Sequence, residues 1–122
     1  MLLRAMRLSD LDNIMPLEHQ LFSSPWSKDD YIYELSSNPY AKYYVLEDDK
    51  IVGYVGIWIT YETAQITTIG IAKERQGEGL SKLLMNKVIE ETKDCEAITL
   101  EVRVSNVKAI KLYESYGFKK EA

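Results

Sequence analysis

The sequence predicts an α/β domain built on one mixed β-sheet. Two apolar segments, Lys42–Glu47 and Ile51–Ile59, are separated by three polar residues, which is typical of an antiparallel hairpin. Further along the chain, Gln65–Ile71, a helix beginning near Leu80, and Ala97–Val104 follow one another as strand, helix and strand. Antiparallel strands followed by such a crossover indicate a mixed sheet covered by helices.

The N-terminal segment is expected to add a short strand and a helix. Arg4–Leu8 has the length of a short strand, and Ser9 with Asp12 has the spacing of a capping box. Apolar residues recur along the expected helix, although Pro16 should kink or split it. This stripe consists of Leu11, Ile14, Met15, Leu21 and Phe22.

Two further helices are expected before residue 95, one from a capping signal and one from its apolar periodicity. Ser27 with Asp30 predicts a second capping box, in a helix that runs to about Leu35 and ends at Asn38–Pro39. The helix that begins near Leu80 should reach about Lys93. Its apolar side is expected to consist of Leu80, Leu83, Leu84 and Val88.

The C-terminal segment combines a strand, a helix start and a short helix. Ser105 and Asn106 favour a helix start, and Gly117 favours its end. Glu101 on the strand and Tyr113 on the helix form a possible base and acid pair. Taken alone, Glu101 also fits a surface ion pair, Tyr113 a core tyrosine, and Asn106 a simple helix cap.

Composition indicates a single domain over residues 1–122 and excludes several classes of protein. The 122 residues carry a net charge of −4, which argues against general nucleic-acid binding but suits a basic peptide or amine. No apolar run approaches the roughly 20 residues of a membrane span, and no signal-peptide core is present. Cys95 is the only cysteine, so neither a disulfide nor a cysteine metal site is expected. We therefore expect a cytoplasmic protein that uses no metal.

A glycine-containing turn joins the strand ending at Ile71 to the helix beginning near Leu80. Its sequence, Gln-Gly-Glu-Gly-Leu-Ser over 76–81, would let backbone amides approach an anion at a helix N-terminus. The turn matches neither a Walker loop nor a dinucleotide fingerprint. A phosphate site of another kind and a simple tight turn both remain possible from the residues alone.

These residues resemble the (Gln/Arg)-x-x-Gly-x-(Gly/Ala) signature of the GCN5-related N-acetyltransferases (GNAT), with Gln76 first, Gly79 fourth and Ser81 last. Ser81 departs from the usual glycine or alanine. Within that superfamily the chain resembles the ribosomal-protein-alanine N-acetyltransferase branch over essentially its whole length. The matching blocks are Phe22 with Pro25–Trp26, Glu34–Leu35, Asn38–Pro39, Gly53–Tyr54, and the run LEVRVSN…AIKLYESYGF over 100–118.

The resemblance implies roles for individual residues. Glu101 would be the general base, Tyr113 the general acid and Asn106 a coenzyme A contact. The backbone of Ile69, Gly70 and Ile71 would bind the acetyl and pantetheine part of acetyl-CoA. The pyrophosphate would lie on Gln76, Gly77, Glu78, Gly79, Leu80, Ser81 and Lys82.

The resemblance also implies a splayed GNAT sheet with about four helices and Nα-acetylation of a protein, namely the N-terminal alanine of the eighteenth small-subunit ribosomal protein. Acetylation of a small amine or lysine side chain is the alternative activity, and a silent coenzyme- or partner-binding module is the alternative class. Compared with the family, the chain ends at Ala122 without the last strand. An open sheet edge suggests a homodimer.

Overall fold

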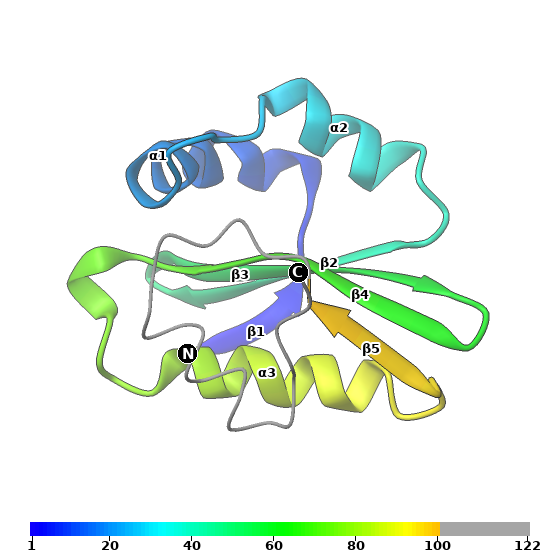
Figure 1. Ribbon diagram of the computed structural model, residues 1–122. Coiled ribbons are helices and arrows are strands. Elements are labelled where there is room, and N and C mark those ends of the chain that lie inside the picture. Colours follow the sequence, from blue (N-terminus) through cyan, green and yellow to red (C-terminus); the bar gives the residue numbers. More distant parts are fainter. Residues whose placement is uncertain (101–122) are drawn as a thin grey trace.

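One β-sheet lies between two layers of helices (Figure 1). The computed structural model describes residues 1–100 of the chain. Within these residues the sheet has five strands, ordered β1-β2-β3-β4-β5. Their bounds are Leu2–Ala5 for β1, Ala41–Asp48 for β2, Lys50–Thr60 for β3, Thr63–Ile71 for β4 and Ala97–Leu100 for β5.

The sheet is mixed, as the sequence predicts. Strands β1 to β4 pair antiparallel with their neighbours, whereas β5 runs parallel to β4. Asp49 takes a left-handed φ of 63° in the turn between β2 and β3, a conformation that Asp adopts more readily than most residues. Residues 101–104 of the predicted last strand, and the predicted helix after it, lie outside the described residues.

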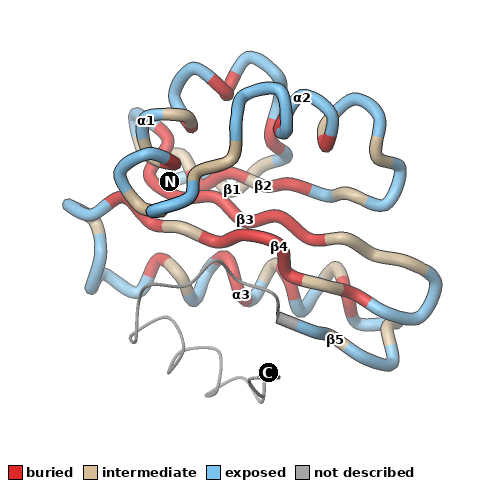
Figure 2. Tube along the Cα trace, turned by 45° about the horizontal axis from the view of Figure 1, so that its top comes forward, coloured by how far each residue is buried: buried red, intermediate tan, exposed pale blue. Residues whose placement is uncertain are grey.

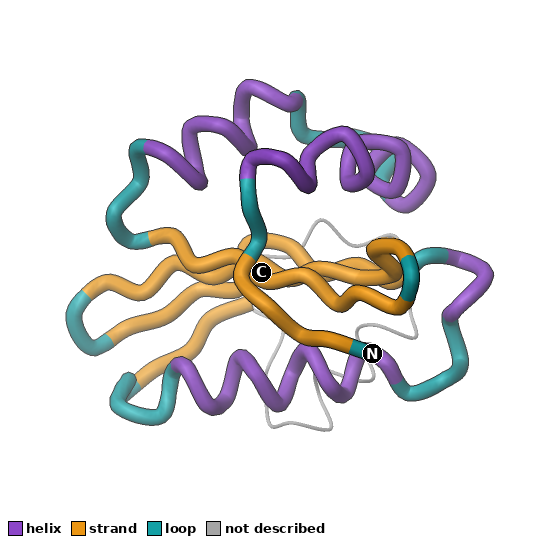
Figure 3. Tube along the Cα trace, turned by 180° about the vertical axis from the view of Figure 1, so that it is seen from behind, coloured by secondary structure: helices purple, strands orange, loops and turns teal. Residues whose placement is uncertain are grey.

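The helices cover both faces of the sheet (Figures 1 and 3). Helices α1 (Leu11–Leu21) and α2 (Lys28–Ser36) lie on one face, and α3 (Leu80–Glu91) lies on the other. Two short 3-10 turns, η1 (Leu8–Asp10) and η2 (Lys73–Arg75), precede α1 and α3. Helix α2 begins at the predicted capping box, where Asp30 N–H donates to Ser27 Oγ and Ser27 N–H donates to Asp30 Oδ2.

The N-terminal segment differs from its prediction in three ways. The first strand occupies Leu2–Ala5 rather than Arg4–Leu8. Ser9 does not cap a helix, because it lies inside η1, and Asp10 accepts the backbone N–H of Arg7 at 2.7 Å. Helix α1 also continues through Pro16 without splitting, since packing of its apolar stripe on the sheet supports the helix.

Buried residues concentrate along β2, β3 and β4 and form a core on each side of the sheet (Figure 2). Leu83 was expected on the apolar side of α3, but it is 43% exposed. The core beneath α1 and α2 contains Met6, Leu11, Ile14, Tyr31, Tyr43, Val45, Ile51 and Tyr54. The core on the α3 side contains Leu46, Val52, Val55, Ile57, Ile66, Ile69, Ile71, Leu80, Leu84, Met85 and Val88.

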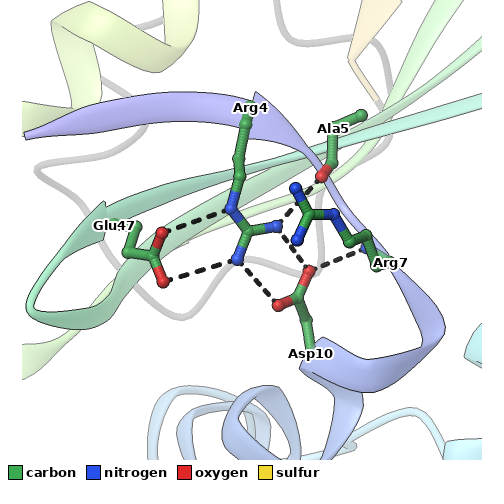
Figure 4. Close-up of polar contacts among 5 residues, drawn as sticks. All are labelled: Arg4, Ala5, Arg7, Asp10 and Glu47. Carbon is green, nitrogen blue, oxygen red and sulfur yellow. Dashed lines mark hydrogen bonds and ion pairs between the residues drawn. The ribbon is translucent and has the colours of Figure 1, made fainter.

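A charged cluster ties the first strand to its surroundings (Figure 4). Arg4 of β1 donates two hydrogen bonds of 2.8 Å to the carboxylate of Asp10 in η1. Its Nε also donates to Glu47 of β2 at 3.3 Å. This cluster joins the edge strand, the entry to α1 and the second strand. Over residues 1–100, no helix combines the length and apolar character that crossing a bilayer requires.

Candidate active site

The glycine turn has a backbone conformation that is compatible with an anion-binding loop. Gly77 and Gly79 have φ angles of +86° and +78°, in the left-handed region that glycine tolerates best. Gly79 precedes α3 directly, and no side chain caps that helix end. The N–H group of Lys82 donates to the Gly79 carbonyl oxygen at 3.2 Å. Those of Leu80 and Ser81 come before any possible intrahelical acceptor and are available to a negatively charged group.

Gln76 connects this loop to the strand before it. Its Nε2 donates a hydrogen bond of 3.0 Å to the carbonyl oxygen of Ile71, the last residue of β4. Gln76 belongs to the predicted pyrophosphate segment, and its side chain points toward the end of β4. The bond fixes the spacing between β4 and the loop.

Arg75 holds the loop from a second direction. Its Nη2 lies 2.9 Å from Oδ2 of Asp48, the last residue of β2, and its Nε donates to both carboxylate oxygens of Glu78 at 3.0 and 3.1 Å. The hydrogen bond to Asp48, followed by that to Glu78, raises the pKa of Arg75 above its usual value. Lys50 and Glu74 form a second ion pair at 3.4 Å between the same two segments. These ion pairs connect the loop to the β2–β3 hairpin.

The end of β4 lies between the two cores. Ile69 and Ile71 are buried on the α3 side. Gly70 faces the other side, where a Cβ built on it would lie 2.8 Å from Leu21 Cδ1 at the end of α1. The close approach of α1 therefore requires a residue without a side chain at position 70.

The structure brings most of the predicted coenzyme-binding residues into one continuous segment. Ile69–Ile71 end a central strand, and residues 76–82 form the loop and the first turn of the helix that follows it. Glu101, Asn106 and Tyr113 lie outside the described residues, so their predicted roles stay predictions. The last described residue of β5, Leu100, is paired with Ile66 of β4.

Sequence reasoning missed two buried carboxylates beneath α1 and α2. Glu18 is 0% exposed and accepts hydrogen bonds from Trp26 N–H and from the hydroxyls of Tyr31 and Tyr54, at 2.7 to 2.9 Å. Glu18 lies at helical spacing from Ile14 and Leu21 and therefore on the apolar side of α1. Its burial could have been predicted from this position.

The second missed carboxylate is Glu34 of α2, which is 6% exposed. It accepts hydrogen bonds from the Tyr43 hydroxyl at 2.7 Å, from Asn38 Nδ2 at 2.8 Å, and from Trp58 Nε1. These donors come from the sheet and from the segment after α2. The two carboxylates therefore connect the helical layer to the strands.

Comparison with known proteins identifies the family. The model of the acetyltransferase (GNAT) family matches residues 11–118. A protein of Bacillus subtilis, provisionally named a ribosomal protein bS18-alanine N-acetyltransferase, is 45% identical over 93% of this chain and 78% of its own length. The ribosomal protein bS18-alanine N-acetyltransferase of Salmonella typhimurium is 29% identical over 90% of this chain and 75% of its own length.

Solved structures show the same fold. The crystal structure of the ribosomal-protein-S18-alanine N-acetyltransferase of Escherichia coli superposes with a TM-score of 0.86 at 23% identity, covering 99% of this chain and 79% of that one. A mutant of the spermidine N-acetyltransferase of Vibrio cholerae gives a TM-score of 0.77 at 30% identity, covering 99% of this chain and 80% of that one. The chain belongs to the GNAT family of acetyltransferases.

Proposed function

We propose that this enzyme transfers the acetyl group of acetyl-CoA to the N-terminal α-amino group of a protein. The 45% identity to the Bacillus subtilis protein, over 93% of the chain, is the observation that carries this proposal. It favours the N-terminal alanine of the eighteenth small-subunit ribosomal protein as the acceptor. An α-amino group has a pKa near 8, against about 10.4 for lysine. A larger fraction of α-amino groups is therefore already unprotonated at neutral pH, and the enzyme needs a weaker base to deprotonate the rest.

The loop before α3 is the proposed pyrophosphate site. Its left-handed glycines and the uncapped start of α3 support this assignment. In the register given by the sequence, Gln76 is the first residue of the family signature, Gly79 the fourth and Ser81 the last, and Ser81 lies in the first turn of α3.

Glu101 and Tyr113 are the proposed base and acid. The amine nitrogen attacks the thioester carbonyl carbon, the carbon–sulfur bond breaks, and the acetyl group passes directly to nitrogen. Glu101 takes the proton from the amine, directly or through a water, and Tyr113 returns a proton to the departing thiolate. Asn106 would contact coenzyme A, and backbone N–H groups of Ile69, Gly70 and Ile71 would stabilise the developing oxyanion.

An acetylation assay tests both the acceptor and the residues. We expect an alanine-initiated peptide of the ribosomal protein to be acetylated and the same peptide with a blocked N-terminus to remain unmodified, by mass spectrometry. Glu101→Gln and Tyr113→Phe should each lower kcat by about 10²-fold or more while leaving the Kd for acetyl-CoA within about twofold. Unchanged turnover in both variants would refute the catalytic assignment, and an acetyl-enzyme formed with acetyl-CoA alone would refute direct transfer.

Acetylation of a polyamine is the second candidate. The 30% identity to the spermidine N-acetyltransferase structure and the net charge of −4 favour it. Both acceptors belong in the same assay at equal concentration. A higher kcat/KM for spermidine than for the peptide would make the polyamine the substrate.

A further inference from the structure

The strand that carries the proposed acetyl-binding residues contains a β-bulge. Gly56 of β3 pairs with Thr68 of β4, whereas the next β3 residue, Ile57, pairs with Ile66. Thr67 is therefore an extra residue in β4, and two β4 residues lie opposite Gly56. The bulge therefore lies two residues before Ile69, the first of the proposed acetyl-binding residues.

The bulge determines which way the end of β4 faces. Ile66 and Ile69 both belong to the core on the α3 side, although residues three apart in a regular strand face opposite sides. The extra residue removes this conflict. Without it, Ile69 and Ile71 would turn toward α1, where Leu21 leaves room only for the glycine at position 70.

One tyrosine reaches this bulge across an intervening strand. Tyr43 of β2 pairs with Gly56 of β3, and its ring lies over that glycine, since a Cβ built there would fall 2.2 Å from Tyr43 Cε2. The Tyr43 hydroxyl lies 3.1 Å from Thr67 Oγ1 in β4. Gly56 is therefore the residue that allows Tyr43 to contact the bulge.

A carboxylate from the helical layer fixes the tyrosine in turn. The Tyr43 hydroxyl donates to Glu34 Oε1 at 2.7 Å, and Trp58 Nε1 donates to the same oxygen. Because a phenol has one proton and Glu34 accepts it, Thr67 Oγ1 is the donor toward the Tyr43 oxygen. Tyr43, Glu34 and Thr67 are 4%, 6% and 5% exposed, so water does not compete freely for these bonds.

We infer that Tyr43, held by Glu34, is a positioning residue for acetyl transfer: through Thr67 it keeps the bulge of β4 in place and so sets the orientation of Ile69–Ile71. The inference rests on the proposed function, because it assigns the acetyl group to those residues. Tyr43 acts through the strand and need not touch the substrate. Loss of its hydroxyl should therefore affect the chemical step more than coenzyme binding.

Tyr43→Phe is the principal test, because it removes the hydroxyl and keeps the ring over Gly56. We expect kcat to fall about tenfold or more, with the KM for acetyl-CoA within about twofold. Thr67→Val should produce the same loss, Thr67→Ser should retain activity near wild type, and the double variant Tyr43→Phe/Thr67→Val should lose no more than either single change.

Tyr31→Phe is the matched control. Tyr31 is also fully buried and donates a hydrogen bond of 2.7 Å to a carboxylate, but this carboxylate is Glu18 of α1 rather than Glu34. We expect Tyr31→Phe to lower thermal stability about as much as Tyr43→Phe while leaving kcat near wild type. Equal loss of kcat in the two variants would overturn the inference.

Amide hydrogen exchange measured by NMR provides a readout that needs no activity. Exchange at residues 67–69 should accelerate in Tyr43→Phe and Thr67→Val and stay as in wild type in Tyr31→Phe. Unchanged exchange at these residues in Tyr43→Phe would refute the role of Tyr43. Failure of the wild-type enzyme to acetylate either acceptor would instead refute the proposed function, and the exchange data would still decide whether Tyr43 holds the bulge.

Discussion

Gly79 shows how a single residue shapes the candidate coenzyme site. Its φ of +78° and ψ of 12° allow the chain to turn from the loop into α3. A Cβ built on Gly79 meets no atom within 4 Å, so a side chain there would not clash within the protein. The need for glycine comes from the backbone conformation, and from any ligand that approaches the amides closely.

We predict that Gly79→Ala weakens acetyl-CoA binding about tenfold. A left-handed conformation costs an L-residue roughly 1–2 kcal/mol, and relaxation of that strain would move the first amides of α3. Isothermal titration calorimetry measures the change. Leu83→Ala is the control, because Leu83 lies inside α3, is 43% exposed and is not among the proposed coenzyme-binding residues; its Kd should stay within about twofold of wild type. Equal affinities for wild type and Gly79→Ala would contradict the proposed role of Gly79 in coenzyme binding.

At the scale of elements, the cluster around Arg4 joins β1 to η1 and β2 (Figure 4). Hydrogen bonds from Arg4 hold the pKa of Asp10 below its usual value, although burial acts in the opposite direction. Because the folded-state pKa of Asp10 is lower than its unfolded value of about 3.9, ionised Asp10 stabilises the folded state above that pH. The contribution is lost as the pH falls through the folded-state pKa.

Asp10→Asn should therefore destabilise the domain in a pH-dependent way. At pH 7 we expect the free energy of unfolding to fall by about 1–3 kcal/mol, because Arg4 loses its charged partner in η1. The difference from wild type should shrink below about pH 4, where wild-type Asp10 also begins to lose its charge. Urea unfolding at a series of pH values measures both effects.

Asp12→Asn serves as the control for this experiment. The Asp12 side chain is 84% exposed and pairs with the exposed Lys28 at 2.9 Å. Such surface pairs contribute about 0–1 kcal/mol, so Asp12→Asn should change stability little at any pH. A constant difference between Asp10→Asn and wild type from pH 7 to pH 3 would show that Asp10 stabilises the fold by packing rather than by charge.

At the scale of the whole molecule, the parts predicted from the sequence are those that local chemistry determines. The β2–β3 hairpin and the Ser27–Asp30 capping box depend on residues a few positions apart, and both are confirmed. The start of α1 was predicted wrongly, because Asp10 and Asp12 both lie near it. Asp10, not Asp12, accepts the backbone N–H at the start of this region, and Arg4 of β1 also donates to Asp10.

The candidate site divides in the same way. The loop before α3 could be predicted, since its glycines and the helix start are adjacent in sequence. The contacts of Glu18 and Glu34 could not, because their partners Tyr54 and Trp58 are 36 and 24 residues away on β3. The Tyr43–Thr67 contact also requires knowledge of strand order and register. Tertiary pairing, rather than local pattern, creates these buried networks.

The loop is connected to the rest of the domain strongly enough that coenzyme binding should stabilise the entire fold. Arg75 joins the loop to the end of β2, Gln76 joins it to β4, and Ala72 N–H donates to the Val52 carbonyl at 2.8 Å. A ligand that needs this arrangement binds the folded state and not the unfolded chain, so its binding energy adds to the free energy of unfolding.

Thermal unfolding should therefore shift as one transition when acetyl-CoA is added. At a ligand concentration 100 times the Kd, the added stability is about 2.7 kcal/mol, which raises Tm by on the order of 10 °C for a domain of this size. Acetylpantetheine lacks the pyrophosphate together with the 3′-phosphoadenosine and should give a much smaller shift at the same concentration. Equal shifts for the two ligands would mean that the loop does not bind the pyrophosphate, because the whole 3′-phosphoadenosine diphosphate part of acetyl-CoA would then contribute nothing.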